Sequence, residues 1–331
     1  MAAAGAAPAV AAGAEQPRRL RMPGSAPQPP SRPLLAGLGW GLLAAGIWAC
    51  YTVLARLGVK AGLGPADLTL LRFAPGALLL LPWMWRWGWR GLAGIGWRRG
   101  GVLALLAGPG FSLLFMSGFV FAPLAHGAVI APAAQMVTGL SASAWLARQP
   151  VSRESLVGAG GVLLGLLFMG SDSLLQGEVR TTLFGDLLFA LAGACWGLFG
   201  ALSRRWQVDP VRVTAVVLVL SLLSFAPPYL LLTGGAGLRD AGAGMLALQV
   251  LAQGLGAGLV AMLAYNRAAA LLGAGRAGFF GALVPGAASL LAIPVLGEVP
   301  TTLQVLGIVS VVAGLAVAFG GARWLLQRDR G

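Results

Sequence analysis

The sequence predicts an all-α membrane protein of ten transmembrane helices, arranged as two inverted five-helix repeats. Three observations support this fold class. Apolar residues dominate the composition, features of the first half of the chain return in the same order in the second half, and the basic residues gather in every second connection between the apolar runs. The third observation also fixes the number of helices, because one helix more or fewer would move the later basic residues to the wrong side of the membrane.

The composition excludes a soluble globular domain. Of the 331 residues, 58% are hydrophobic and only 10% are charged, and the mean hydropathy is +0.83, whereas roughly a quarter of the residues of a soluble domain are charged. The 51 glycines and 20 prolines are tolerated in a membrane bundle, where neighbouring helices satisfy the backbone groups that these residues leave free. The lipid bilayer is therefore the expected surrounding of this chain.

Charge and cysteine usage exclude further classes. The formal net charge is +13, but the arginines are spread between the apolar runs rather than gathered in one patch, so no nucleic-acid partner is expected. The two cysteines, Cys50 and Cys195, lie inside apolar runs, which is typical of packing residues rather than of a disulfide framework. With one histidine, the chain offers no set of metal ligands, and nothing in it predicts a cofactor.

The two ends of the chain differ from its apolar middle. Residues 1–33 pass from an alanine-rich stretch to Arg18, Arg19 and Arg21 and then to a proline-rich stretch. A secretory signal carries its basic residues before its apolar region, and here they follow it, so we expect a disordered cytoplasmic tail. Residues 322–331 are expected to form a short second cytoplasmic tail.

Between these ends, apolar runs of roughly 17 to 25 residues recur, the length that crosses a hydrocarbon core of about 30 Å. Proline interrupts the third run at Pro109 and the fourth at Pro132. The predicted helices span residues 34–56, 66–83, 101–120, 127–146, 155–171, 184–203, 212–233, 244–265, 276–296 and 301–321.

The second half of the chain repeats the first, so that two five-helix repeats are expected over residues 34–171 and 184–321. Internal duplication is frequent in secondary transporters, whose substrate site lies where the two repeats meet. Trp48, Tyr51 and Arg56 correspond to Trp196, Phe199 and Arg204, and Pro65 and Pro82 correspond to Pro210 and Pro227.

An odd number of helices per repeat makes the repeats inverted, because the second must start on the opposite side of the membrane from the first. The basic residues test this arrangement, since cytoplasmic connections collect Lys and Arg. With both termini in the cytoplasm, the cytoplasmic segments hold 18 of the 23 basic residues, and the outer segments hold only Arg56, Lys60, Arg180 and Arg239. We therefore expect a multi-pass protein of the inner (plasma) membrane with both termini inside.

Three stretches carry a resemblance to the EamA-type branch of the drug/metabolite transporter superfamily, which covers about residues 35 to 320. They are Trp48 with Asp67–Phe73, Ala122–Gly127, and Leu271–Pro285 with Leu296–Pro300. The resemblance implies a ten-helix carrier that exports or exchanges small metabolites. It also implies a central cavity between the two halves.

The sequence departs from the family pattern on its fourth helix. In the family a Leu-Gly-Glu motif usually ends both the fourth and the ninth helix. Here the ninth ends in Leu296-Gly-Glu298, but the fourth ends in Leu146-Ala-Arg148. Gln135 likewise stands where the second repeat has Pro285. These differences argue against a mechanism that needs symmetrical gates.

Polar residues and helix breakers near the middle of the membrane are candidate substrate contacts. From a helical rise of about 1.5 Å per residue, Gln135 and Gln253 lie roughly 13 Å from the outer ends of their helices. Gly108-Pro109-Gly110 lies at a similar depth, with Ser112 one turn beyond. A broken helix there exposes backbone carbonyls, and transporters hold ligands at such places. Alternatively, the two glutamines only bridge neighbouring helices.

Three aromatic residues and one arginine complete the substrate candidates. Trp48 and Tyr51 lie in the outer half of the first helix and Trp196 in the inner half of the sixth, where they either gate and stack on an organic substrate or simply pack. Arg72 lies about 9 Å inside the second helix, where a charge is costly unless it is paired or hydrated. It either receives a substrate carboxylate or snorkels and pairs with Asp67, and the second interpretation is favoured.

The candidates for gating or coupling interrupt helices or differ between corresponding positions of the two repeats. They are Pro109, His126, Pro132, Arg276 and Pro285. His126 is the sole side chain expected to titrate near neutrality. No acidic residue falls in the middle of a predicted helix, whereas a proton-coupled pump usually exposes a buried carboxylate. We therefore expect a facilitator or exchanger, or proton coupling through His126.

These observations predict a secondary transporter that moves a small neutral or zwitterionic metabolite, such as an amino acid, by alternating access in efflux or exchange. A channel-like facilitator stays open as an alternative. A membrane-embedded enzyme is disfavoured, because such enzymes cluster Asp, Glu or His near one membrane face, and the chain has neither such a cluster nor a glycine-rich ATP loop with a lysine. No catalytic residue is therefore predicted, and both a monomer and a homodimer are compatible with the sequence.

Overall fold

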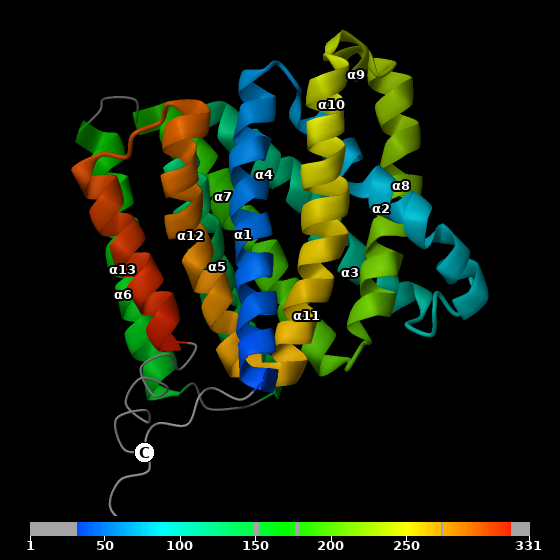
Figure 1. Cartoon of the computed structure of the whole chain (residues 1–331), viewed down its shortest axis with the longest axis horizontal. Coiled ribbons are helices and arrows are strands. Elements are labelled where there is room, and N and C mark those ends of the chain that lie inside the picture. Colours follow the sequence, from blue (N-terminus) through cyan, green and yellow to red (C-terminus); the bar gives the residue numbers. More distant parts are fainter. Residues whose placement is uncertain (1–31, 148–151, 176–178, 273, 319–331) are drawn as a thin grey trace, which may run out of the picture.

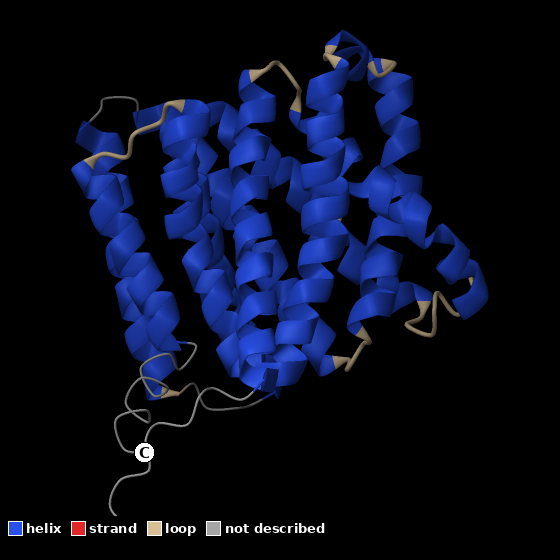
Figure 2. Cartoon of the chain, in the orientation of Figure 1, coloured by secondary structure: helices blue, strands red, loops and turns tan. Residues whose placement is uncertain are grey.

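The computed structural model describes residues 32–147, 152–175, 179–272 and 274–318. Within these ranges every regular element is a helix (Figure 2). In chain order the helices are α1 (Arg32–Lys60), α2 (Pro65–Trp87), α3 (Trp97–Ala107), α4 (Pro109–Phe121), α5 (Leu124–Ala147), α6 (Arg153–Leu175), α7 (Val179–Arg205), α8 (Pro210–Thr233), α9 (Ala236–Asp240), α10 (Ala243–Gln249), the π-helix η1 (Val250–Val260), α11 (Ala261–Leu272), α12 (Ala274–Leu296) and α13 (Thr302–Ala318).

Every predicted span corresponds to a helix or to a broken helix in the described ranges. The third span consists of α3 and α4, and the eighth consists of α10, η1 and α11 in direct succession. By length and composition, six helical stretches of the described residues can cross a membrane, and α13 and part of α12 are shorter apolar helices. The short helix α9, between the seventh and eighth spans, was not predicted.

Corresponding helices of the two halves run in opposite directions (Figure 1). The second helix of the first repeat, α2, descends in this view, whereas its counterpart α8 rises. The last helix of the first repeat, α6, likewise rises, whereas its counterpart α13 descends. We call the end of the bundle that carries the α1–α2, α8–α10 and α12–α13 connections, at the top of Figure 1, the upper end.

Local sequence explains where several helices begin and end. Proline occupies the first turn of α2, α4 and α8, where its missing N–H would have had no helical partner. The N-cap of α8 is Asp209, whose carboxylate accepts hydrogen bonds from the amides of Val211 and Arg212 at 3.1 and 2.9 Å. At the other end of α8, Gly234 adopts φ of 59°, the left-handed conformation that glycine takes without steric cost.

The helix pair α6–α13, at the left edge of Figure 1, is held at backbone contact by glycine. A Cβ atom added to Gly158 of α6 would lie 2.5 Å from the carbonyl oxygen of Gly314 of α13, and one added to Gly314 would lie 2.6 Å from the carbonyl oxygen of Gly158. Such close approach is how helices associate where the surrounding lipid is as apolar as the side chains. At the upper end of this pair, Asp172 accepts hydrogen bonds from Thr301 and Gln304 at 2.6 and 2.7 Å.

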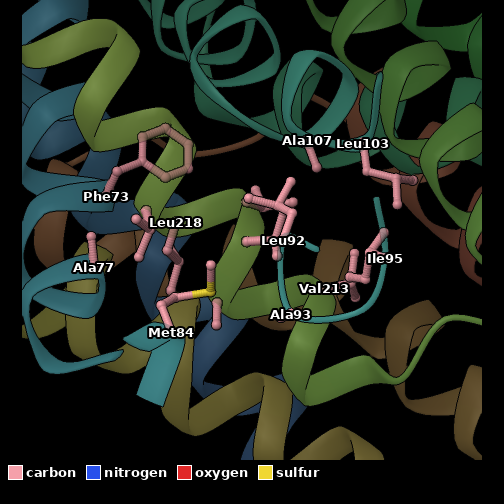
Figure 3. Close-up of a cluster of buried hydrophobic side chains, with 14 of the residues drawn as sticks. Phe73, Ala77, Met84, Leu92, Ala93, Ile95, Leu103, Ala107, Val213 and Leu218 are labelled. Atoms are coloured by element: carbon pink, nitrogen blue, oxygen red, sulfur yellow. The ribbon is translucent and has the colours of Figure 1, made fainter. Parts of the chain in front are cut away.

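One hydrophobic core forms where α2, α3 and α8 meet, and the α2–α3 connection folds into it (Figure 3). Leu92 and Ile95 of this connection are buried together with Leu103 of α3 and Val213 of α8. Leu92 takes a positive φ of 47°, an uncommon conformation for a residue with a branched side chain. The burial of the Leu92 side chain offsets the cost of this backbone conformation. The buried side chain also anchors the α2–α3 connection to the lower part of the bundle.

Candidate functional site

Arg72 lies where helices of the two repeats meet, inside a set of aromatic rings. Only 8% of its surface is exposed. The Cζ atom of its guanidinium lies 4.7 Å from the ring centroid of Tyr51 on α1 and 5.4 Å from that of Phe111 on α4. These distances are those of cation–π contacts, which stabilise a cation only in part when it leaves water.

The favoured interpretation that Arg72 pairs with Asp67 is wrong. The carboxylate of Asp67 instead accepts hydrogen bonds from the Tyr229 hydroxyl of α8 and from the amide of Gly64, the latter at 2.8 Å. The physical reason is helical geometry, because side chains meet when they are three or four residues apart, and Asp67 and Arg72 are five apart. Among the described residues, no ion pair includes Arg72.

Two buried polar groups lie close together at this place. The Nη1 atom of Arg72 has no hydrogen-bond acceptor in the described part of the chain, and the buried hydroxyl of Tyr51 has Arg72 as its polar neighbour. The guanidinium only donates hydrogen bonds, whereas the hydroxyl both donates and accepts. Buried donors without partners are uncommon, and they mark places where a ligand or water completes the structure.

A buried hydrogen bond fixes the position of Arg72 relative to α4. The hydroxyl of Thr69 donates to that of Ser112 at 2.9 Å, and neither residue is exposed. Thr69 lies one helical turn before Arg72, and Ser112 follows Phe111 directly. Ser112, a predicted substrate contact, is therefore placed by the structure in a link between α2 and α4.

A stripe of phenylalanines on α4 forms the wall of the site. Phe111, Phe115 and Phe119 are spaced four residues apart, so they share one face of the helix. Phe111 packs against Trp196 of α7 with the ring centroids 4.8 Å apart, and Phe115 packs against Tyr51 at 6.1 Å. The sequence interpretation named Tyr51 and Trp196 but missed this stripe, although the four-residue spacing of phenylalanine was a readable signal.

Two interruptions of regular helix adjoin these residues. The third span breaks at Gly108, between α3 and Pro109 of α4, as its Gly-Pro-Gly sequence predicts. A Cβ atom at Gly108 would lie 2.5 Å from the hydroxyl oxygen of Ser221 on α8, a buried hydroxyl without a partner in the described residues. The eighth span contains the π-helix η1, and π-turns frequently occur at functional sites.

The π-helix carries Gln253, which is fully buried. Its Nε2 atom donates to Gln249 at 2.9 Å, and Gln249 in turn donates to the Leu54 carbonyl of α1 at 2.7 Å. The link to the neighbouring helix α1 is therefore made by Gln249, while the amide nitrogen of Gln253 bonds within its own span. Its carbonyl oxygen Oε1 has no partner in the described part of the chain.

The remaining candidates differ in where they lie. Trp48 packs against the apolar cluster that contains Tyr51, Phe111 and Phe115, and its ring centroid lies 5.5 Å from that of Tyr265 on α11. The side chain of Gln135 is exposed. Pro132 and Pro285 lie inside α5 and α12. Arg276 is in the first turn of α12, but its side chain lies outside the described part of the structure, as does Arg148.

A polar cluster, here called the upper latch, joins the two halves at the upper end. Glu298, in the α12–α13 connection, accepts hydrogen bonds from Arg56 at 3.0 Å and from the Leu124 amide at the start of α5 at 3.0 Å, and its carboxylate lies 2.9 Å from the Lys60 ammonium. The Arg56 guanidinium also donates to the carbonyl of Phe119, so the latch rests on the end of the phenylalanine stripe. Because Glu298 belongs to the second half and its partners to the first, the latch ties the two halves together at the upper end.

The latch predicts a pH dependence of stability. Burial by itself would raise the pKa of Glu298, but the hydrogen bonds from Lys60 and Leu124 and the charge of Arg56 outweigh it and hold the pKa below the ordinary 4.5. A carboxyl group with a lowered pKa stabilises the folded state above its unfolded pKa, and this contribution is lost as the pH falls through the folded pKa. We expect the melting temperature of the purified protein in detergent to fall as the pH drops below 4.5, and to fall less in Glu298→Gln. Equal pH profiles would contradict this prediction.

His126, predicted as a coupling residue, has a buried acidic partner. Its Nδ1 atom lies 2.8 Å from the carboxylate of Asp186 on α7. The histidine is 1% exposed and the aspartate 13%. The pair connects the first turn of α5 with the second turn of α7 and so crosses between the two repeats. The sequence interpretation missed this partner because nothing in the spacing of the two residues brings them together.

Two pockets lie near the ends of the bundle. The first has a volume of about 310 Å³ beside the upper latch and is lined by Arg56, Pro123, Leu124, Ala125, Ser289, Ala292, Glu298, Val299, Pro300, Thr301 and Gln304. The second has a volume of about 180 Å³ between α2, α8 and α11 and is lined by Leu80, Trp83, Trp87, Val211, Thr214, Leu259, Met262, Leu263 and Asn266. Arg72 lines neither of them.

Known proteins share both the sequence pattern and the fold. The model of the EamA-like transporter family matches residues 35–171 and again residues 183–320. The chain is 25% identical over 229 residues to YyaM, an uncharacterized transporter of Bacillus subtilis, a match that covers 67% of this chain and 73% of YyaM. It is 28% identical over 197 residues to an uncharacterized transporter of Archaeoglobus fulgidus, which covers 57% of this chain and 65% of that protein.

A protein of known crystal structure has a similar fold. Its TM-score with this chain is 0.57 at 19% sequence identity, and the match covers 86% of this chain and 95% of the other. At this identity the likeness concerns the fold alone.

Proposed function

The chain belongs to the EamA-like transporter family, and from this premise we propose that it is a secondary transporter for a small neutral or zwitterionic metabolite, such as an amino acid. It moves this substrate across the inner (plasma) membrane by alternating access, in export or exchange. The family is one of transporters and not of enzymes. The proposal names the kind of substrate and the mode of transport, which family membership leaves open.

The observation that carries the proposal is the group of unpartnered polar atoms where the two repeats meet. Arg72 comes from the first repeat and Gln253 from the second, and each has a buried polar atom without a partner in the described residues. A secondary transporter binds its substrate at such an interface of repeats, close to interrupted helices. The break at Gly108 and the π-helix η1 supply two such interruptions.

The upper latch supports alternating access. It ties α1, α4 and α5 to the α12–α13 connection. To open the upper end between these elements, Glu298 and Arg56 must separate. We assign the upper end to the outside of the membrane and both termini to the cytoplasm, because the connections at the opposite end carry most of the basic residues.

Counterflow in proteoliposomes tests this proposal. Vesicles that contain the purified full chain are loaded with an unlabelled mixture of amino acids and diluted into buffer that contains one radiolabelled amino acid at a time. A carrier gives saturable uptake that internal amino acid stimulates, because each turnover returns the site to the other side. Empty vesicles are the control. Uptake that rises linearly with concentration and ignores the internal mixture would instead identify the channel-like alternative.

The pair His126–Asp186 leads to a prediction about proton coupling. If protons enter the cycle, they bind at this pair, because it is the buried histidine–carboxylate contact between the repeats in the described part of the chain. We expect His126→Gln to lose any stimulation of uptake by an imposed pH gradient while it retains counterflow at symmetrical pH. Glutamine keeps a hydrogen bond to Asp186 but cannot take up a proton. Unchanged stimulation in this variant would rule out the histidine route.

A further inference from the structure

We propose that Arg72 and Tyr51 form a carboxylate-binding subsite, so that the substrate is a small monocarboxylate with an apolar body. This inference rests on the proposed transport function, since it names the chemical group that the transport site recognises. Amino acids with apolar side chains are the zwitterionic members of this class, and simple organic acids without an amino group share the carboxylate and serve as probes of the subsite. The subsite consists of the guanidinium of Arg72, the hydroxyl of Tyr51 and the aromatic rings around them.

The first argument is the charge of Arg72. A buried guanidinium that lacks an anion is costly, and within the described ranges no carboxylate pairs with this one. The rings of Tyr51 and Phe111 compensate only part of the lost hydration. An anion that binds between the repeats would remove the remaining cost, and this gain would appear as binding affinity.

The second argument is the hydrogen-bonding chemistry of the buried polar atoms at this place. Arg72 Nη1 donates hydrogen bonds and lacks an acceptor among the described residues, and the buried Tyr51 hydroxyl beside it can donate a second one. A carboxylate offers two acceptor oxygens, and hydrogen bonds from a guanidinium to a carboxylate are among the strongest in proteins. The guanidinium has no acceptor to offer to an ammonium group or to an amide nitrogen, and its charge repels an ammonium group. The chemistry of these two side chains therefore selects an acidic substrate group.

The third argument is the contrast with arginines that have structural roles in the same protein. Arg56 donates to Glu298 and to the Phe119 carbonyl, and Arg212 donates to the Ala93 carbonyl at 3.3 Å. The link between α2 and α4 is made by Thr69 and Ser112 and does not require the guanidinium of Arg72. Arg72 is therefore held in place by its helix, while its charged group stays available.

The aromatic residues around Arg72 indicate the chemistry of the rest of the substrate molecule. Phe111 and Trp196 pack together beside Arg72, and Phe115 stacks on Tyr51, so the body of the substrate meets aromatic rings and is expected to be apolar. Gln253 Oε1 is an unpartnered acceptor on η1, and the residue after it, Gly254, packs against the Leu71 carbonyl of α2. This acceptor suits the α-ammonium group of an amino acid, which a simple monocarboxylate lacks.

Ligand-induced shifts of the melting temperature test the subsite on the purified full chain. The probes are 3-phenylpropionate, 3-phenylpropanamide and phenylalanine, which differ in the acidic and amino groups but share one apolar body. We expect the two acids to raise the melting temperature in a saturable manner and the amide to have no effect. We expect Arg72→Gln to weaken acid binding by about tenfold or more, and Tyr51→Phe to weaken it severalfold. Binding of the amide equal to that of the acid would overturn the proposal.

One further variant, Arg72→Lys, allows the test to be decided even if Arg72→Gln does not fold. Arg72→Lys retains the charge but loses the paired geometry of the guanidinium, so its affinity should fall between those of the wild type and Arg72→Gln. If Arg72→Gln does not fold, as judged by gel filtration, Arg72→Lys and Tyr51→Phe carry the test. Wild-type affinity for 3-phenylpropionate in both of them would overturn the subsite.

The results also distinguish a failure of the proposed subsite from a failure of the proposed transport function. Acid binding that depends on Arg72 without any counterflow would retain the subsite and reject the transport proposal. Saturable counterflow of neutral metabolites that is unchanged in Tyr51→Phe and Arg72→Lys would retain transport and reject the subsite. Phenylalanine and 3-phenylpropionate are compared in the same assay, and tighter binding of phenylalanine would show that the site also recognises the ammonium group.

Discussion

Replacing Gly158 with leucine is expected to destabilise the protein by about 1–3 kcal/mol or more. The added Cβ atom would lie 2.5 Å from the Gly314 carbonyl oxygen and 2.6 Å from Ala318 Cβ, so α6 and α13 must move apart. Separation would also strain the hydrogen bonds from Thr301 and Gln304 to Asp172 at the upper end of the same pair. Thermal unfolding in detergent, or titration with a denaturing detergent, measures the loss.

Gly160 provides the matched control for this prediction. It lies on α6 two residues from Gly158, yet a Cβ atom added to it meets nothing within 4 Å. Gly160→Leu should therefore leave the stability nearly unchanged or improve it slightly, because glycine is a poor helix former. Similar losses in both variants would mean that leucine acts through the helix itself and not through contact with α13.

Replacing Glu298 with alanine is expected to open the upper end. The change leaves Arg56, Lys60 and the Leu124 amide without their shared acceptor. Arg56 and Glu298 are 17% and 22% exposed, so the cost should lie between that of a surface pair, about 0–1 kcal/mol, and that of a buried pair, about 3–5 kcal/mol. A loss in the middle of this range shifts the balance between closed and open states by roughly tenfold or more.

Thiol labelling measures this opening. Ser289 lines the pocket beside the latch, and a cysteine placed there, with Cys50 and Cys195 replaced by alanine, reports access from the upper end. We expect a water-soluble maleimide to label Ser289→Cys about tenfold faster when Glu298 is alanine. The matched control is Asp240→Asn, an exposed acid of α9 at the same end. Equal labelling rates with and without Glu298 would show that the latch does not control access.

The fold could be predicted from the sequence because its main signals are local. The length of each apolar run identified the spans, and the predicted family and all-helical membrane fold are confirmed by the match to the EamA-like transporter family. The break at Gly108 was predictable because glycine and proline act on the backbone where they stand. The π-helix η1 was not, since nothing in the residues of Val250–Val260 distinguishes a π-turn from an α-turn.

The contacts of the site could be predicted only in part, because most of them join residues far apart in the chain. Tyr51, Arg72, Trp196 and Gln253 were named for their chemistry and depth. The partner of Asp67 was misjudged because Tyr229 lies 162 positions away. The partners of Glu298 in the upper latch were not predicted for the same reason, since Arg56 and Glu298 are 242 positions apart. Polar residues at helix ends reveal their partners only when the packing of the helices is known.

The π-helix η1 gives the eighth span a means of rotation. Each π-turn holds one residue more than an α-turn, and one residue corresponds to about 100° around a helix with 3.6 residues per turn. If a π-turn moves along the span or reverts to an α-turn, α10 and α11 twist relative to each other while their hydrogen bonds are kept. Gln253 would then swing away from Gln249 and α1. A carrier built in this way could turn one face of its site without bending a helix.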